Sequence, residues 1–414
     1  VDYDHDAGGR ISEVTMTAGG TPTTLATDIE YHPFGALRGL TLGNGLVESR
    51  TYDLAGRVSA ISATGVQAES YGYDPAGNVS DITDTLHPSY ARDFQYDYLD
   101  RLTEEVRTNP PATPIQYQYD ANGNRTAATV PPSNSAGTVI STTSNRLAGF
   151  SIYDAAGNAT YIPGSGTAGP SYGDSGAMRE TGPPSWSVTA RYNGLGERVL
   201  SIQSWLSDTV FIYDNNARVV ATVEVAPGTS VVNKYRVYVW IDNRPLAFVT
   251  YTKSGASFTA VRVQYIHTDH IEWPKFTTSQ SGAFDYKRTA LSVFGLVNTQ
   301  TIPDAHPLPP AEPRLMFPGQ IWMSGYGTMY YNYYRDYGPR EGRYLQSDPI
   351  GLAGGLNTYA YANNNPLRFV DLLGLVADCG DDEDCIEKCL REYYGGLYDS
   401  ARDLSFFSLS TLIA

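Results

Sequence analysis

The residue types that could do chemistry are concentrated between residues 317 and 375, where Arg335, Asp336, Arg343, Asp348 and Asp371 occur. Two carboxylates that lie close together cannot both ionise cheaply, so the pKa of one rises and the pair can act as acid and base. A neighbouring arginine can orient a carboxylate or stabilise a developing oxyanion. Asp-Pro and Asp-x-x-Gly are also ordinary turn sequences, so a structural role for these aspartates stays open.

A second group that could bind a ligand is His267-Thr-Asp269-His270. A strand places residues three apart on opposite faces, and no further metal ligand follows at a recognisable spacing. We therefore expect hydrogen-bonded structural histidines here, and we predict neither a metal nor another cofactor.

The elements that must position these residues are visible as internal repeats. A Tyr-Asp-x-x-Gly-Arg/Asn pattern begins at Tyr52 and returns, with some variation, at residues 73, 96, 119, 153, 192 and 213, with weaker copies at His5 and Tyr31 and a degenerate one near Tyr172. The tyrosine ends a strand, the aspartate makes a turn, the glycine supplies a positive φ angle, and apolar residues start the next strand. Each unit is thus a hairpin that needs neighbours to bury its face, which predicts an all-β stack in which these tyrosines and aspartates are scaffold.

Composition agrees with a repetitive β structure. Among 414 residues, Gly 40 and Pro 25 are frequent, Tyr 32 exceeds Phe 13, and only 18% are charged. No apolar stretch approaches the ~20 residues that a membrane helix needs. The net charge of −15 argues against nucleic-acid binding through neutralisation of phosphates. The chain opens on Val1 inside a pattern, which suggests a fragment of a longer protein.

The Tyr-Asp-x-x-Gly-Arg repeat, at about 21-residue spacing, resembles the YD-repeat, or Rhs, family, which includes polymorphic toxins, the C subunits of Tc toxins and teneurin-like shells. Members wind the hairpin ribbon into a hollow shell. The segment 262–275 resembles a family block that normally carries a glycine where this chain has Glu272, so that turn was expected to differ. The resemblance extends through Gly342-Arg-Tyr344 and ends in the Pro366-x4-Asp371-x2-Gly374-Leu375 signature of the Rhs core.

Family members with this signature cut themselves after the final leucine with an aspartic-protease-like pair. The resemblance implies that Asp348 and Asp371 form the pair, that Arg335 assists, and that the Leu375–Val376 bond is cut once per molecule. Asp336 and Arg343 lie near enough in sequence to exchange roles with them. Many relatives have proline after the last aspartate, where this chain has Leu372.

The predicted organisation has four parts. Residues 1–300 form the YD-repeat shell, the proline-rich stretch 301–316 is a connector, 317–375 form the autoproteolytic core, and 376–414 are a C-terminal passenger. The passenger is acidic and contains Cys379, Cys385 and Cys389, which could be free thiols, a disulfide pair or a weak metal site. A helix is expected over 381–394, and the small passenger is expected to be partly helical or disordered and could be a truncated toxin.

Three functions are compatible with this pattern. The first is the shell of a polymorphic toxin, secreted or delivered to its target, which encloses its own C-terminal passenger and cuts it free; its further partners would be an immunity protein or delivery machinery. The second is a secreted or wall-associated adhesin whose tyrosine-rich surface binds carbohydrate or a neighbouring cell. The third is a core whose aspartate pair no longer works.

Overall fold

The computed structural model describes residues 1–18, 21–108, 111–128, 144–147, 152–161, 169–182, 187–203, 207–255, 257–301, 314–322 and 329–375. The predicted passenger, with its cysteines and expected helix, lies outside these residues, as does most of the proline-rich connector. Within the described parts, no helix is long and apolar enough to span a bilayer.

The first sheet contains twelve antiparallel strands, each hydrogen-bonded to its neighbours in the chain. They are β1 (Asp2–His5), β2 (Ile11–Ala18), β3 (Thr21–Tyr31), β4 (Leu37–Leu42), β5 (Val47–Tyr52), β6 (Val58–Ala63), β7 (Gln67–Tyr73), β8 (Val79–Asp84), β9 (Arg92–Tyr96), β10 (Leu102–Arg107), β11 (Ile115–Tyr119) and β12 (Arg125–Ala128). A short 3-10 helix, η1 (Pro88–Tyr90), precedes β9.

The second sheet repeats this serial arrangement with twelve further strands. They are β13 (Ser171–Tyr172), β14 (Met178–Thr181), β15 (Val188–Tyr192), β16 (Arg198–Gln203), β17 (Asp208–Tyr213), β18 (Val219–Val225), β19 (Val232–Ile241), β20 (Arg244–Ser254), β21 (Ser257–Thr268), β22 (Pro274–Thr278), β23 (Phe284–Ala290) and β24 (Val297–Thr301). The predicted all-β fold of stacked hairpins is confirmed.

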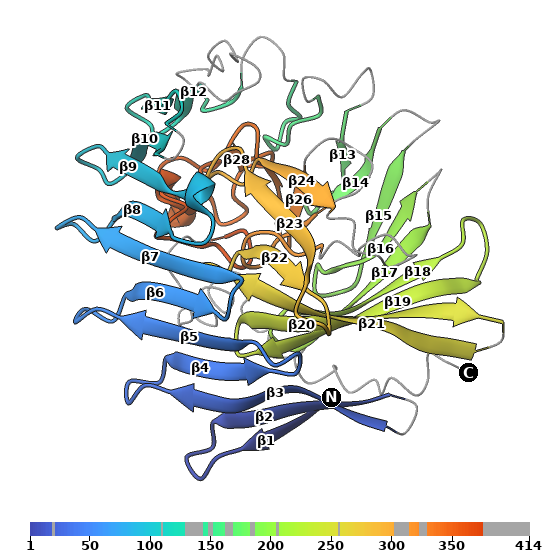
Figure 1. Cartoon of the computed structure of the whole chain (residues 1–414). Coiled ribbons are helices and arrows are strands. Elements are labelled where there is room, and N and C mark those ends of the chain that lie inside the picture. The colour runs from blue at the N-terminus through green and yellow to red at the C-terminus, as the bar shows by residue number, and fades with distance from the viewer. Residues whose placement is uncertain are drawn as a thin grey trace.

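A third, four-stranded sheet lies between the two large ones (Figure 1). It consists of β25 (Ile321–Trp322), β26 (Tyr330–Asn332), β27 (Arg335–Gly338) and β28 (Arg343–Tyr344), followed by η3 (Gly351–Gly354) and η4 (Ala362–Asn364). Tyr330, Tyr337 and Tyr344 of this sheet pack in one buried cluster with Trp273 and Phe317, so the last described part of the chain is an interior element.

The hairpin turns form as their sequence predicts. In the turn after β5, Asp53 Oδ1 accepts the backbone N–H groups of Ala55 and Arg57, both at 2.9 Å, and Gly56 adopts φ +79°. Such side-chain bonds satisfy backbone donors that a tight turn leaves free. The tyrosine that ends the strand is explained by its hydroxyl: Tyr73 OH donates to the Val58 carbonyl at 2.7 Å, which phenylalanine could not do. Equivalent bonds join Tyr52, Tyr96, Tyr119, Tyr172, Tyr192 and Tyr213 to earlier carbonyls.

The two large sheets meet directly along one region. Apolar side chains of β2, β3 and β4 pack against those of β19, β20 and β21 in a buried cluster. Polar contacts extend the joint: Gln67 Nε2 donates to the Thr268 carbonyl at 2.9 Å, and Asn44 Nδ2 donates to Thr278 Oγ1 at 3.1 Å. Residues about two hundred positions apart in sequence are therefore held together by burial and hydrogen bonds.

The turn at Glu272 corrects one expectation. Asp269 Oδ1 accepts the N–H groups of Ile271 and Trp273 at 3.0 Å, as in the other repeats, and Glu272 takes the glycine position with φ +62°. The Glu272 carboxylate is bound by Arg50 at 2.5 Å and by the Thr268 hydroxyl at 2.6 Å. These bonds hold a side chain in a backbone conformation that normally favours glycine, so the turn is unchanged.

Candidate active site

Strand β27 positions the first residue of the candidate site. Successive side chains of a strand point to opposite faces, so Arg335 and Asp336 face different neighbours. Arg335 is directed towards Asp348, which follows β28, and towards Asp371, which lies in the last described turn. Asp336 turns to the second large sheet, where it pairs with Arg198 at 2.9 Å.

The three residues predicted from the family signature come together. Arg335 Nη1 lies 3.0 Å from Asp348 Oδ2, and Nη2 lies 3.1 Å from Asp371 Oδ2. All three side chains are almost fully buried. A guanidinium group thus joins the two carboxyl groups and offsets one negative charge in a site shielded from water.

Asp371 is saturated with hydrogen bonds. Its Oδ1 accepts the N–H groups of Gly374 at 2.7 Å and Leu375 at 2.9 Å, while Oδ2 accepts Arg335 and the Tyr344 hydroxyl, the latter at 2.7 Å. Each carboxylate oxygen of Asp371 thus has two donors around it. The Oδ1 contact with the residue four positions later is shared with the YD turns. The second contact differs, because Asp371 accepts the N–H three positions later and Asp53 the N–H two positions later.

Asp348 has fewer partners and a different electrostatic environment. Its Oδ1 accepts the Ile350 N–H at 3.0 Å, and its Oδ2 contacts Arg335. Burial raises its pKa to about 6; Arg335 and the Ile350 N–H oppose the shift, and Asp371 adds a smaller increase. Asp348 is therefore the carboxyl that can carry a proton near neutral pH, chiefly because it is desolvated.

The backbone next to the predicted cleavage point lies against these groups. The Arg335 Nε atom donates to the Gly374 carbonyl. A Cβ atom on Gly354 would collide with both Asp348 Oδ2 and the Leu375 carbonyl oxygen, so the two oxygens flank this glycine. Gly374 itself has φ +74°, and a Cβ atom there would collide with the Asn332 carbonyl. Both glycines allow close approach of backbone to the acidic residues.

The other signature positions, Pro366 and Leu375, are buried near the candidate site. Pro366 is buried in the turn that leads to Asp371, and Leu375 is buried beside the site. Val376, the residue after the predicted scissile bond, lies outside the described residues. The structure thus places one side of that bond.

Neither of the two residues considered as substitutes belongs to this site. Asp336 bonds Arg198 and Gln346, and Arg343 donates to the Asn145 carbonyl and lies over the ring of Tyr359. Both tie the inner sheet to the surrounding repeats.

The two histidines make hydrogen bonds within the protein. His267 is fully buried and its Nε2 lies 2.9 Å from Thr278 Oγ1; burial lowers its pKa to about 4. His270 Nε2 donates to the Leu367 carbonyl at 2.7 Å. Within the described ranges, no three His, Cys, Asp or Glu side chains are grouped as metal ligands would be.

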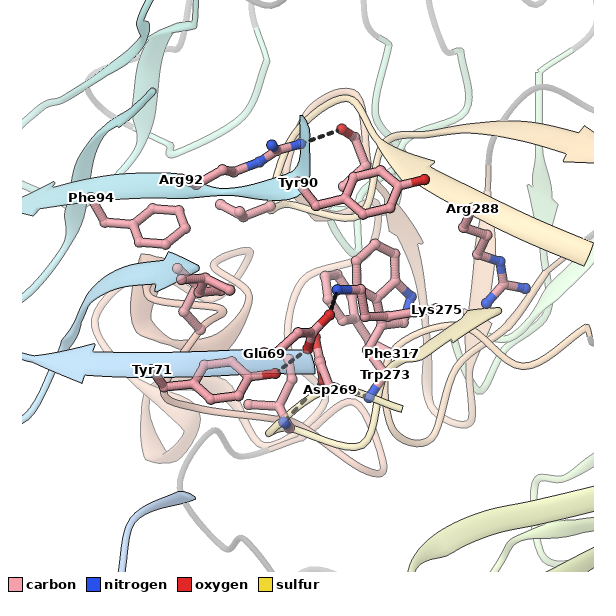
Figure 2. A pocket seen from close by; sticks show the side chains of 15 residues that line it. Glu69, Tyr71, Tyr90, Arg92, Phe94, Asp269, Trp273, Lys275, Arg288 and Phe317 are labelled. Carbon is pink, nitrogen blue, oxygen red and sulfur yellow. Dashed lines mark hydrogen bonds and ion pairs between the residues drawn. The ribbon is translucent and has the colours of Figure 1, made fainter. Parts of the chain in front are cut away.

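A cavity lies beside the turn that contains Pro366, with Leu367 in its wall (Figure 2). Its most prominent polar contact is a buried ion pair between Lys275 and Glu69, and Tyr71 donates its hydroxyl to Glu69 as well. Arg92 donates to the Ala290 carbonyl at 2.7 Å. These contacts link the two large sheets, and the pair of carboxylates at Arg335 remains the better candidate for chemistry.

Sequence reasoning missed two members of the site. Tyr344 bonds Asp371 and places its ring 3.6 Å from the Arg335 guanidinium carbon. Asn332 donates from Nδ2 to the Tyr344 hydroxyl at 2.7 Å and to the Asp371 carbonyl at 2.8 Å. A signal for Tyr344 was present: a hairpin from 335 to 344 that pairs Tyr337 with Tyr344 places this ring on the face of Arg335.

Known proteins share this fold and parts of the sequence. A family model described as the teneurin YD-shell matches residues 3–160. Toxin protein Tse5 of Pseudomonas aeruginosa is 36% identical over 115 residues, which cover 28% of this chain and 8% of Tse5. The resemblance to Rhs/YD-repeat proteins is confirmed. The double-stranded DNA deaminase toxin A of Burkholderia cenocepacia is 34% identical to this chain over 118 residues, again 28% of the chain and 8% of the toxin.

Solved structures support the shell architecture. The Photorhabdus luminescens Tc holotoxin pore matches with a TM-score of 0.74 at 19% identity, covering 91% of this chain and 20% of that one. At this identity the likeness concerns the fold. The chain spans less than a tenth of the two curated toxins, so it corresponds to a small part of each.

Proposed function

We propose that this chain is part of the shell of a polymorphic toxin, that it encloses its C-terminal passenger, and that it cuts itself once after Leu375. The supporting observation is the Arg335 guanidinium that joins Asp348 and Asp371 beside the Leu375 carbonyl. The names of two similar proteins include the word toxin, which favours this function over an inert shell.

The two aspartates would have different roles. Asp348, whose pKa is raised to about 6, donates a proton towards the Leu375 carbonyl oxygen. Asp371 fixes the Gly374 and Leu375 N–H groups and accepts the proton of the attacking water as one of its bonds gives way. Water adds to the carbonyl carbon, the bond to the Val376 nitrogen breaks, and that nitrogen takes up the proton that Asp371 accepted from water. The proton on the former carbonyl oxygen returns to Asp348 as the carbonyl re-forms. The products are a carboxylic acid at Leu375 and a free amine at Val376.

The direct test is the intact denatured mass of the purified chain beside an Asp371→Asn variant. We expect the wild-type chain to split at Leu375–Val376 and the variant to stay whole. Asp269→Asn is the matched control, because Asp269 is also a buried turn aspartate that accepts two backbone N–H groups. A wild-type chain that remains at full length after native folding contradicts the proposal, as does cleavage in Asp371→Asn.

Enclosure of the passenger needs a separate measurement. We expect the 376–414 fragment to stay with residues 1–375 during size-exclusion chromatography and to separate in denaturant. Ready loss of the fragment under native conditions would argue that it is not enclosed. The same proposal includes the domain boundaries at residues 300, 316 and 375. It also includes an immunity or delivery partner and delivery outside the producing cell.

An adhesin is the alternative, and the exposed aromatic turn tips favour it. Tyr98 is 91% exposed and Phe34 is 59% exposed at turns of the first sheet. Aromatic faces of this kind can stack on sugars or on a neighbouring protein. Binding of the chain to immobilised glycans or cells, lost in Tyr98→Ala and Phe34→Ala, would support this function, and no binding would argue against it.

A further inference from the structure

Seven of the repeat turns of this protein fall into two chemical kinds, distinguished by their last residue. Four turns end in arginine, at positions 10, 57, 101 and 218, and three end in asparagine, at positions 78, 124 and 158. In both kinds the last residue donates a side-chain hydrogen bond to the aspartate of its own turn. The two residue types therefore look interchangeable in the sequence pattern.

Arginine-ended turns have only donors to offer. Arg57 Nε donates to Asp53 Oδ2 at 2.7 Å, and its guanidinium lies 4.2 Å from the ring centre of Tyr73 in the next repeat. Arg101 does the same with Asp97 and Tyr119. A guanidinium has five N–H donors and no acceptor, so such a turn cannot receive a hydrogen bond from another part of the chain through this side chain.

Asparagine-ended turns keep the donor and add an acceptor. Asn78 Nδ2 donates to Asp74 Oδ2 at 3.0 Å, which leaves Asn78 Oδ1 to accept Asn365 Nδ2 at 2.8 Å and Arg368 Nη1 at 3.3 Å. In the repeat at 119–124 the same exchange occurs: Asn124 Nδ2 donates to its own aspartate, and Oδ1 accepts Asn357 Nδ2 at 2.9 Å.

These two asparagines are almost fully buried, in contrast to the partly exposed arginines. Asn78 and Asn124 are each 1% exposed, whereas the side chain of Arg57 is 37% exposed. A buried amide oxygen needs a partner, and the inner segment supplies it. Two of the three asparagine-ended turns thus receive residues 357–368 through a side-chain acceptor. Asn365 Nδ2 also donates to the Asp100 carbonyl at 2.8 Å, so the arginine-ended turn 97–101 takes part through its backbone alone.

The docked segment reaches the candidate active site. The Thr358 carbonyl accepts Arg335 Nη1 at 3.2 Å and the Asp348 N–H at 2.8 Å, and the chain continues from Arg368 to Asp371 within a few residues. A shift of this segment would move the acceptor that helps hold Arg335 between the two carboxylates.

We propose that Asn78 and Asn124 are positioning residues: their amide oxygens, at a turn position where four other repeats carry arginine, select the docking site of residues 357–368 and so align Arg335, Asp348 and Asp371. The docking part stands on the contacts alone, whereas the effect on cleavage rests on the proposed self-cleavage. The sequence feature that carries this role is the exchange of arginine for asparagine at the end of a repeat.

The test reverses the polarity of one contact in the full chain. Asn78→Arg places a donor opposite the Asn365 donor, and Asn365→Asp places an acceptor opposite the Asn78 acceptor. The double variant faces a donor with an acceptor again. Arg57→Asn is the matched control, since it makes the opposite exchange in a turn with no bond to residues 357–368 among the contacts described above. The readouts are deuterium uptake by residues 357–375 and the cleaved fraction, with uptake by 47–63 as a check on the sheet.

Loss of two buried hydrogen bonds is expected to speed exchange of 357–375 about tenfold or more in each single variant. The control should stay within about twofold of wild type, and the double variant should recover at least half of the loss on a logarithmic scale. Unchanged exchange in both single variants, or no recovery in the double variant, overturns the docking role. If wild type does not cleave but exchange follows this pattern, docking stands and the proposed function fails. If the variants exchange faster but cleave as fully as wild type, the positioning role is overturned and the docking role stands.

Discussion

The raised pKa of Asp348 leads to a prediction about the pH dependence of cleavage. Burial moves this pKa from the ordinary 3.8 to about 6, so the folded chain holds a proton there below pH 6 and loses it above. If the protonated form donates to the Leu375 carbonyl, the first-order rate of cleavage is flat below pH 6. Above pH 6 it falls about tenfold for each pH unit, because the protonated fraction falls by that factor.

The assay starts from unfolded full-length chain recovered in guanidinium chloride. The chain is diluted into buffers between pH 5 and 8.5, samples are quenched in acid and denaturant, and the cleaved fraction is read by intact mass. At pH 8 the rate should be about one hundredth of the plateau. Tyrosine fluorescence during refolding supplies the folding rate, so that slow folding is not mistaken for slow cleavage.

Two results would refute this reasoning. A rate that rises with pH through 6 would mean that ionised Asp348 is the active form and acts as a base. A rate that is independent of pH would mean that Asp348 exchanges no proton in the slow step. Arg335→Gln tests the cause, because the guanidinium holds the pKa of Asp348 down. The pH at which the residual cleavage rate falls to half should lie above 6 in this variant. Arg335→Lys keeps a positive charge and should move that pH less.

Three further outcomes are expected. Tyr344→Phe removes the hydroxyl that bonds Asp371, so cleavage should slow by about tenfold while stability falls by roughly 1 kcal/mol; an unchanged cleavage rate would show that this bond is dispensable. Gly374→Ala should abolish cleavage because its Cβ meets the Asn332 carbonyl, whereas Gly228→Ala, with φ +66° but open space, should cost only about 1 kcal/mol in a urea titration and cleave normally. Arg198→Leu leaves Asp336 buried without its charge partner and should lower the free energy of unfolding by about 3–5 kcal/mol, while Arg10→Ala, which breaks an exposed pair, should change it by less than about 1 kcal/mol. Similar urea midpoints for these last two variants would contradict the argument from burial.

Much of the scaffold could be predicted because each repeat determines its own turn. Tyr52 and Tyr73 end strands, and Asp53 closes a turn, through contacts within about twenty residues along the chain. The Glu272 turn could not be predicted, because the side chain that stabilises its positive φ angle is Arg50, which is far away in sequence. Local pattern describes local structure, and distant partners decide the exceptions.

The candidate site shows the same division. Arg335, Asp348 and Asp371 could be proposed from their motifs, and the structure brings them together; their chemistry stays a prediction. Nothing in the pattern showed that Asp371 would be saturated and Asp348 desolvated, since this difference depends on Tyr344 and on burial. The distinction between asparagine and arginine at the end of a repeat was also hidden, because it depends on partners such as Asn365, almost three hundred residues away.

The serial order of the strands has a consequence for folding during synthesis. Every strand of the two large sheets is bonded to its neighbours in the chain, so each ribbon can form hairpin by hairpin as residues leave the ribosome, with little entropy spent on closing long loops. Asn78 and Asn124 must wait for Asn365 and Asn357, which are made more than two hundred residues later. Residues 357–368 can therefore dock only on a first ribbon whose strands have already been synthesised and paired.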